Sequence, residues 1–280
     1  MPKSIRAKVA VAAAVAATLA VVGTGVTLFA LMVDETHFDR PDPAFDALAA
    51  DLAAIDGVSE LQRERWVEAP TFADPSANVH AVVDAFAWPD VFALACSPAY
   101  PDAVAWSFEI VTPSGARVHV AADAAPGCPD LGFDVPTVVG SIDRVAPGRT
   151  VQAALWEGER FSVSMPGVDD EGAAALLPLV AEADHLRAAA NTASDVPLEI
   201  AGPLLGIEIR PGEGPAYHAL LTRLLEDHGA TGFFAGGAGK PVDGVEKVQI
   251  SAPEAQHAAI TREVAASGLP IATLPVSFLP

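Results

Sequence analysis

Two cysteines are the residues of this sequence whose type and spacing point most directly to chemistry. Cys96 and Cys128 are the only cysteines in the chain. Neither belongs to a CxxC motif, and no histidine lies within a few residues of either, so a zinc site is not indicated. In an exported domain two cysteines indicate one disulfide, which here would close a loop of 33 residues. The alternative is two unpaired cysteines that pack as small apolar side chains.

The histidines and carboxylates are scattered, and their spacing predicts no catalytic or metal centre. His80 and His119 both fall on expected strands and could face one another, but a strand histidine is more commonly a half-exposed surface residue. Glu182 and His185 share a helix face, yet a di-iron bundle needs a second such pair, so we expect a solvent-facing pair. A hydrolytic site assembled from distant carboxylates stays open as an alternative.

The glycine-rich stretch 236–240 (GGAGK) lacks the features of a phosphate-binding loop. That loop requires GxxxxGK followed by Ser or Thr, whereas here Phe234 replaces the first glycine and Pro241 follows Lys240. We interpret the stretch as a hairpin connection. Because neither a GxSxG nor an HExxH motif occurs, the sequence predicts no catalytic residue, no cofactor and no metal.

Four tryptophans, Trp66, Trp88, Trp106 and Trp156, are candidates for an aromatic binding face. Trp106 alternates with Phe108 along an expected strand, which is the pattern of residues that face a core. Core packing is therefore the expected role of Trp106, and a ligand platform made of these aromatic side chains is the alternative.

Composition narrows the class of protein. The chain has 280 residues, a formal net charge of -20, 51% apolar residues and a mean hydropathy of +0.34. The hydropathy argues against general disorder, and the acidic excess excludes nucleic-acid binding through a broad basic face. The acidic residues are dispersed, which favours a role in solubility, with a response to cations or to a basic partner as the alternative.

Residues 9–33 form a run of 25 residues without charge, and Lys3, Arg6 and Lys8 precede it. At about 1.5 Å per residue the run is long enough to cross a bilayer. The basic flank predicts a cytoplasmic N-terminus, with the remainder of the chain outside. We therefore predict an uncleaved, single-pass signal anchor at the cell membrane. A cleaved signal peptide is the main alternative, although its apolar core is normally shorter and ends in an A-x-A pattern.

After a predicted tether at 34–43, the pattern predicts helices that alternate with pairs of strands. Asp42 is an expected N-cap for a helix that begins at Pro43, and Gly57 ends that helix. A second, short helix begins at Pro89. Strands are expected at 58–67, 77–86, 104–111 and 116–121.

The C-terminal part repeats this order of elements without measurable sequence identity. It contains an expected helix, two strands, a second helix and a final edge segment, at 216–228, 230–234, 245–251, 253–266 and 269–278. The stretch between the two parts is rich in strand signals. There we expect strands at 135–144 and 150–156, a helix at 169–190 and one or two strands at 198–210.

This order of elements predicts an α+β fold in which a transmembrane helix precedes two ferredoxin-like α/β sandwich domains with antiparallel or mixed sheets. The predicted segments are a cytoplasmic flank at 1–8, the anchor at 9–33 and the tether at 34–43. The first α+β domain then covers 44–128 and the second 129–280, within which 129–195 could be a separate strand-rich subdomain.

The layout resembles that of uncharacterised single-pass membrane-anchored proteins of high-GC Gram-positive bacteria. The resemblance consists of 12 arginines against 4 lysines, 56 alanines, the single anchor and the small acidic α/β units. The resemblance assigns no functional role to any residue of this chain. Together with the lack of a catalytic motif, the layout predicts an extracytoplasmic module that binds or scaffolds an envelope protein or ligand. An envelope hydrolase with a carboxylate-based site and an acidic, cation-responsive module are the alternatives.

Overall fold

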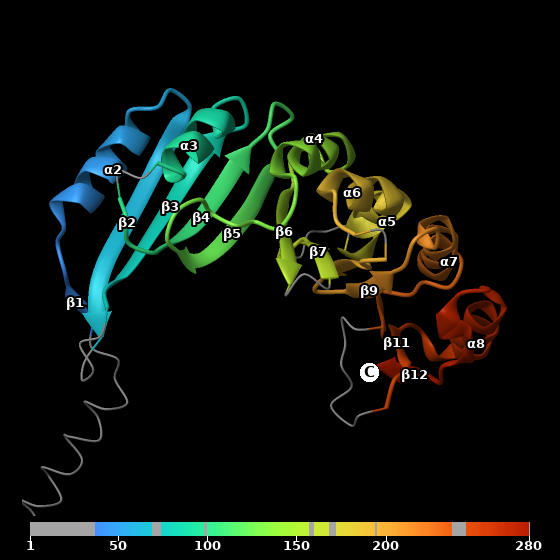
Figure 1. Cartoon of the computed structure of the whole chain (residues 1–280). Coiled ribbons are helices and arrows are strands. Elements are labelled where there is room, and N and C mark those ends of the chain that lie inside the picture. Colours follow the sequence, from blue (N-terminus) through green and yellow to red (C-terminus); the bar gives the residue numbers. More distant parts are fainter. Residues whose placement is uncertain are drawn as a thin grey trace, which may run out of the picture.

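The computed structural model describes residues 37–68, 74–97, 100–156, 160–167, 172–193, 195–236 and 245–279. Its strands form one mixed twelve-stranded sheet, and their order across the sheet is their order along the chain (Figure 1). They are β1 (His37–Asp39), β2 (Val58–Glu68), β3 (Ser76–Asp84), β4 (Val104–Val111), β5 (Arg117–Ala125), β6 (Thr150–Trp156), β7 (Arg160–Ser164), β8 (Leu198–Gly202), β9 (Leu205–Ile209), β10 (Gly232–Ala235), β11 (Val248–Ser251) and β12 (Val276–Leu279).

The helices connect successive strand pairs and line one side of the sheet (Figure 1). The α-helices are α2 (Pro43–Ala53), α3 (Trp88–Ala95), α4 (Val135–Val145), α5 (Leu177–Ala181), α6 (Ala183–Ala190), α7 (Gly214–Glu226) and α8 (His257–Ala266). Short 3-10 helices are η1 (Gly172–Leu176), η3 (Glu254–Gln256) and η4 (Pro270–Thr273).

A repeated strand–strand–helix unit builds this sheet. Within each unit two strands pair in antiparallel fashion, as β4 does with β5, and the following helix leads to a parallel strand, as α4 leads to β6. Parallel crossovers are right-handed, and here each one advances in the same direction along the sheet. The helices are therefore placed on the same face, on the outer side of an arch (Figure 1).

Prolines and polar caps begin the helices that follow these strands. Pro43, Pro89 and Pro136 each stand in the first turn of a helix, where the missing N–H costs nothing. The Asp42 side chain accepts hydrogen bonds from backbone N–H groups at the start of α2, and Asp134 does so at the start of α4. These local signals fix where the helices begin.

The core lies between the helices and one face of the sheet. Along β4 the buried side chains Trp106, Phe108 and Ile110 alternate with residues that face the other side. Such alternation is expected for a sheet with one covered face and one solvated face. In the described part of the chain, the face opposite the helices carries polar and small side chains for most of its length.

The structure corrects the predicted fold class. The α+β character is confirmed, but two separate ferredoxin-like sandwiches are not formed, because one sheet continues from β5 into β6. The predicted domain limit at 128–129 falls in the connection between β5 and α4. In a ferredoxin-like domain the strand order departs from the chain order, whereas here each unit is added beside the preceding one.

The predicted membrane anchor at 9–33 lies outside the described residues, and residues 37–39 of the predicted tether form β1. None of the described helices combines the length and apolar composition needed to span a bilayer. The single-pass membrane localisation, with its signal-anchor and extracytoplasmic assignments, is therefore unsupported and is withdrawn.

Two predicted elements also change. Residues 135–144, predicted as a strand, form α4, because Val135, Val138, Val139 and Ile142 lie on one buried helix face. The helix predicted at 169–190 is divided into η1, α5 and α6, with residues 169–171 outside the described set. Pro178 stands in the first turn of α5, in the middle of that stretch, where a continuous helix would need its N–H group.

Candidate functional site

An apolar groove lies where the helix layer is interrupted. α3 packs on α2, whereas α4 packs on α5 and α6, so the two helices belong to separate groups. Two adjoining pockets, of about 160 Å³ and about 540 Å³, occupy the space between them. Trp88, Pro89, Val135 and Pro136 line both pockets, which makes the two hollows parts of one groove. We call it the α3–α4 groove.

Aromatic and aliphatic side chains form most of its surface. Phe92 of α3 and Phe133, just before α4, are half-buried and line the larger pocket. Trp88 is buried and meets Phe92 at 5.5 Å between ring centroids and Phe108 edge-on at 5.0 Å. Ile110 of β4 lines the smaller pocket. Because Trp88 is held by both rings, the groove is formed before any ligand arrives.

A disulfide fixes one end of the groove. Cys96, the C-cap of α3, is bonded to Cys128 in the connection between β5 and α4, the pair that the sequence indicated. Pro129 follows Cys128 directly and lines the larger pocket, as does Phe92, one helical turn before Cys96. The covalent link therefore joins the two walls of the groove, although the helices themselves belong to different packing groups.

A tight turn shapes the wall that leads into α4. Gly132 lines the larger pocket with a φ of 72°, and a Cβ there would lie 2.7 Å from the Leu155 side chain. The Asp130 carboxylate accepts a hydrogen bond from the Gly132 N–H at 2.9 Å. Two residues later Asp134 caps α4 and also accepts from the Thr137 hydroxyl at 3.0 Å. Glycine is thus required at 132 by both its conformation and its surroundings.

Asp143 connects the opposite end of α4 to the β4–β5 turn. Its carboxylate accepts from the Ser114 N–H at 3.1 Å, and the Ser114 hydroxyl donates to the Asp143 carbonyl, also at 3.1 Å. Hydrogen bonding by Ser114, with a weaker approach from the buried Thr112 hydroxyl, lowers the pKa of Asp143. The Thr112 hydroxyl is buried and does not reach normal hydrogen-bond geometry, and Thr112 lines the smaller pocket.

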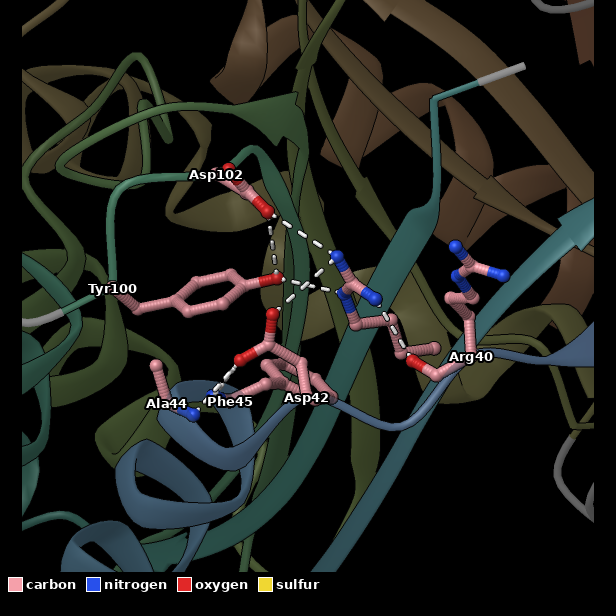
Figure 2. A network of polar contacts seen from close by, with 7 residues as sticks. Arg40, Asp42, Ala44, Phe45, Tyr100 and Asp102 are labelled. Atoms are coloured by element: carbon pink, nitrogen blue, oxygen red, sulfur yellow. Dashed lines mark hydrogen bonds and ion pairs between the residues drawn. The ribbon is translucent and has the colours of Figure 1, made fainter.

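A second polar centre surrounds Arg65 of β2, the strand next to the N-terminal edge strand β1, and Figure 2 shows its partners Arg40, Asp42, Tyr100 and Asp102. The Arg65 Nε donates to the Tyr100 hydroxyl at 3.0 Å, and Nη1 donates to the Arg40 carbonyl at 2.8 Å. Nη2 lies 3.3 Å from an Asp102 oxygen and 3.6 Å from an Asp42 oxygen. The Arg65 side chain, only 11% exposed, thereby joins β2 to three other segments.

The Arg65 network stabilises the fold and leaves little for a ligand. The other oxygen of Asp42 caps α2 by accepting from the N–H groups of Ala44 and Phe45, at 2.8 and 3.2 Å. Burial lowers the pKa of Arg65, but Tyr100 and the two aspartates outweigh this effect and raise it. Burial also raises the pKa of Tyr100.

A hollow of about 530 Å³ adjoins this network. Both arginines that line it are already engaged, Arg65 as described and Arg63 in an ion pair with Asp46. A ligand would have to displace these contacts before it could use either guanidinium group. A ligand in the α3–α4 groove would not have to displace such ion pairs. We therefore regard this groove as the better candidate for a binding site.

The open face of the sheet carries the histidines that the sequence singled out. His80 of β3 contacts the Ser107 hydroxyl at 3.2 Å, and His119 of β5 lies 3.0 Å from the Glu109 carboxylate. Arg117 forms an ion pair with the same carboxylate. Because both histidines meet residues of β4, which lies between their strands, they do not face one another. A serine beside a histidine can form a nucleophile–base pair, but among the described residues no carboxylate orients His80.

The other predicted residues are dispersed. Glu182 and His185 form an exposed pair at 2.6 Å, as expected from their spacing. Trp106 stacks on Phe108 in the core, while Trp156 is 56% exposed on the open face, so the tryptophans share no common platform. Only Trp88 lies in the groove. The sequence analysis did not predict the groove. Its one local signal is Trp88 followed by Pro89 at the start of the short helix α3, which forms one wall.

Within the described ranges no group of three or more His, Cys, Asp or Glu side chains is arranged to hold a metal ion. Comparison of the chain with protein-family models, with curated proteins and with solved structures yields no match.

Proposed function

We propose that this protein is a binding protein that holds an apolar segment of a partner in the α3–α4 groove. The observation that carries the proposal is the break in the helix layer over a continuous sheet, where aromatic side chains line a preformed groove. Its larger pocket, about 540 Å³, is within the range that binding pockets of proteins occupy.

The polar groups near the groove favour binding over catalysis. Asp130 and Asp134 accept hydrogen bonds within their own turns, and Asp143 holds the β4–β5 turn. These groups act as acceptors that shape the walls. Since a catalytic site requires a nucleophile or base directed at a bound substrate, this arrangement fits recognition of a partner better than a hydrolytic reaction.

Gly140 offers a direct test, because it lies in the smaller pocket on the exposed side of α4. A Cβ placed there would meet no atom within 4 Å, and the residue lacks the positive φ that would exclude side chains. Gly140→Phe should therefore fill the groove without disturbing the core. Gly140→Ala is the matched control, since it adds only a methyl group and improves helix propensity.

The test begins with peptides selected from a random displayed library against the full chain and then synthesised. Fluorescence anisotropy should show that each peptide binds the natural chain and Gly140→Ala with similar Kd values. Gly140→Phe should bind at least about tenfold more weakly, a loss of about 1.4 kcal/mol. Thermal unfolding of the three proteins checks that they are equally folded. Equal binding to Gly140→Phe, or a library without binders, would refute the proposal.

A further inference from the structure

Three carboxylates along the α3–α4 groove restrict the kind of partner that it can hold. Asp130 and Asp134 line the larger pocket, and Asp143 lines the smaller one. No lysine, arginine or histidine lines either pocket in the part of the chain that the structure describes. The groove is thus apolar along its length and acidic along its margin.

The charges of these carboxylates are not cancelled locally. Asp130 accepts from a backbone N–H, Asp134 from a backbone N–H and the Thr137 hydroxyl, and Asp143 from the Ser114 N–H. All these donors are neutral. Among the described residues none of the three aspartates forms an ion pair, in contrast to Asp42 and Asp46 beside Arg65 and Arg63. The three carboxylates therefore lie next to the apolar pockets without a cationic partner among the described residues.

On the basis of the proposed function, we infer that the partner of the α3–α4 groove is a basic, apolar peptide segment. Its apolar side chains enter the two pockets, and lysine or arginine side chains that flank them meet Asp130, Asp134 and Asp143. The formal charge of the chain, -20, attracts such a segment from a distance and repels acidic ones. Burial of apolar surface supplies affinity, and the acidic margin selects the sign of the charge.

Four labelled peptides of equal length separate these contributions. Three of them contain leucine and phenylalanine at alternate positions, and the positions between are all lysine, all serine or all glutamate. The fourth has no apolar residue and alternates lysine with serine. Anisotropy titrations of the full chain should place the lysine–apolar peptide first, the serine–apolar peptide about tenfold weaker and the glutamate–apolar peptide weaker again. Raising the salt concentration should reduce the difference, since Asp130 and Asp134 are exposed to solvent and Asp143 is partly exposed.

Two pairs of variants test the residues themselves. Asp130→Asn combined with Asp134→Asn removes two charges but keeps the acceptor for the Gly132 N–H and a good N-cap for α4. It should weaken binding of the lysine–apolar peptide about fivefold to tenfold and leave the serine–apolar peptide unchanged. Asp51→Asn combined with Asp227→Asn removes the same charge from exposed sites on α2 and at the end of α7, and should change neither.

The outcomes distinguish the two proposals. Equal affinity for the lysine, serine and glutamate peptides, with Gly140→Phe still weakening all three, would overturn the basic partner and keep the groove. Binding of the lysine–serine peptide as tight as that of the lysine–apolar peptide would show unspecific attraction to an acidic chain and overturn the inference. No binding of any peptide that contains apolar residues would overturn the proposed function as well.

Discussion

The N-terminal half of the sheet (β2–β5, with α2 and α3) and the C-terminal half (β6–β12, with α5–α8) repeat one unit but differ in how their helices cover it. In the first half β4 has 8 residues and spans about 27 Å, whereas α3, also of 8 residues, spans about 12 Å. In the second half β8 has 5 residues, about 17 Å, and α7 has 13, about 20 Å.

This difference explains where the groove lies. In the C-terminal half the 13-residue α7 is at least as long as the strands β9 and β10 that it connects, and α5 packs directly on α7. In the N-terminal half a short helix crosses long strands, so part of the covered face has to be protected by aromatic side chains and by the loop before α4. The groove is thus a consequence of a mismatch in length within an otherwise regular repeat.

Of the changes considered, removal of the disulfide should produce the largest difference in local stability between the two halves. Replacing Cys96 and Cys128 by serine releases a cross-link between residues 32 positions apart. The free energy of unfolding should fall by about 3–4 kcal/mol. Hydrogen exchange should accelerate in α3 and in residues 126–134 but not in α7. Equal acceleration in both halves would show that the halves do not differ in the way described.

Two glycines in helices compare the packing at the α3–α4 groove with the packing inside the C-terminal half. A Cβ at Gly214 of α7 would lie 3.2 Å from the Ala183 Cβ, whereas a Cβ at Gly140 of α4 would meet no atom within 4 Å. Gly214→Val should lower the free energy of unfolding by about 1–3 kcal/mol through overpacking. Gly140→Val should leave it unchanged or raise it. Urea denaturation measures both, and similar losses would contradict the comparison.

Substitutions of Asp42 test which interactions stabilise the start of α2, at the outer end of the N-terminal half. Asp42→Ala removes both the N-cap and the charge next to Arg65, and should cost about 1–2 kcal/mol. Asp42→Asn keeps the cap acceptor, so it should retain most of this stability. Thermal unfolding of the two variants separates capping from the ion pair. Equal losses would assign the effect to the charge alone.

The smallest effect concerns pH and the contact between α4 and the β4–β5 turn. The pKa of Asp143 is lowered in the folded protein, so the unfolded chain binds a proton at a higher pH. The stabilisation by this carboxylate is thus complete above its ordinary pKa and is lost as pH falls through the folded value. Ser114→Ala should raise the pKa of Asp143 in a carboxyl NMR titration, while Ser277→Ala on β12 should not change it.

The sequence predicted local structure well where caps and breakers coincide. Asp42 and Pro43 mark the start of the first helix, and the structure begins α2 at Pro43. The end predicted at Gly57 was wrong, because α2 ends at Ala53 with Ala54 as its C-cap. The prediction failed at α4, whose β-branched residues suggested a strand. Their spacing, at Val135, Val138 and Ile142, has the period of a helix, and this period was the better signal.

Neither the continuity of the sheet nor the α3–α4 groove could be predicted from local sequence signals. β5 joins β6 through three residue pairs, from Arg117 with Thr150 to His119 with Gln152, and no local signal marks so short a contact. The groove depends on the distance between two helices that belong to different units. Trp88 was recognised as an aromatic candidate, but only the tertiary structure shows that it lines the same pockets as Pro136.

The equivalence of strand order and chain order has a mechanical consequence. Since neighbouring strands are also neighbours along the chain, a pulling force applied at the two ends of the sheet reaches the edge strands first. Each edge strand would be peeled away with its hydrogen bonds breaking one after another, and extension would proceed in steps of a strand or a hairpin. Because the disulfide joins Cys96 to Cys128, the residues between them would not add to the extension of the chain. Such a molecule yields gradually under tension instead of breaking in a single event.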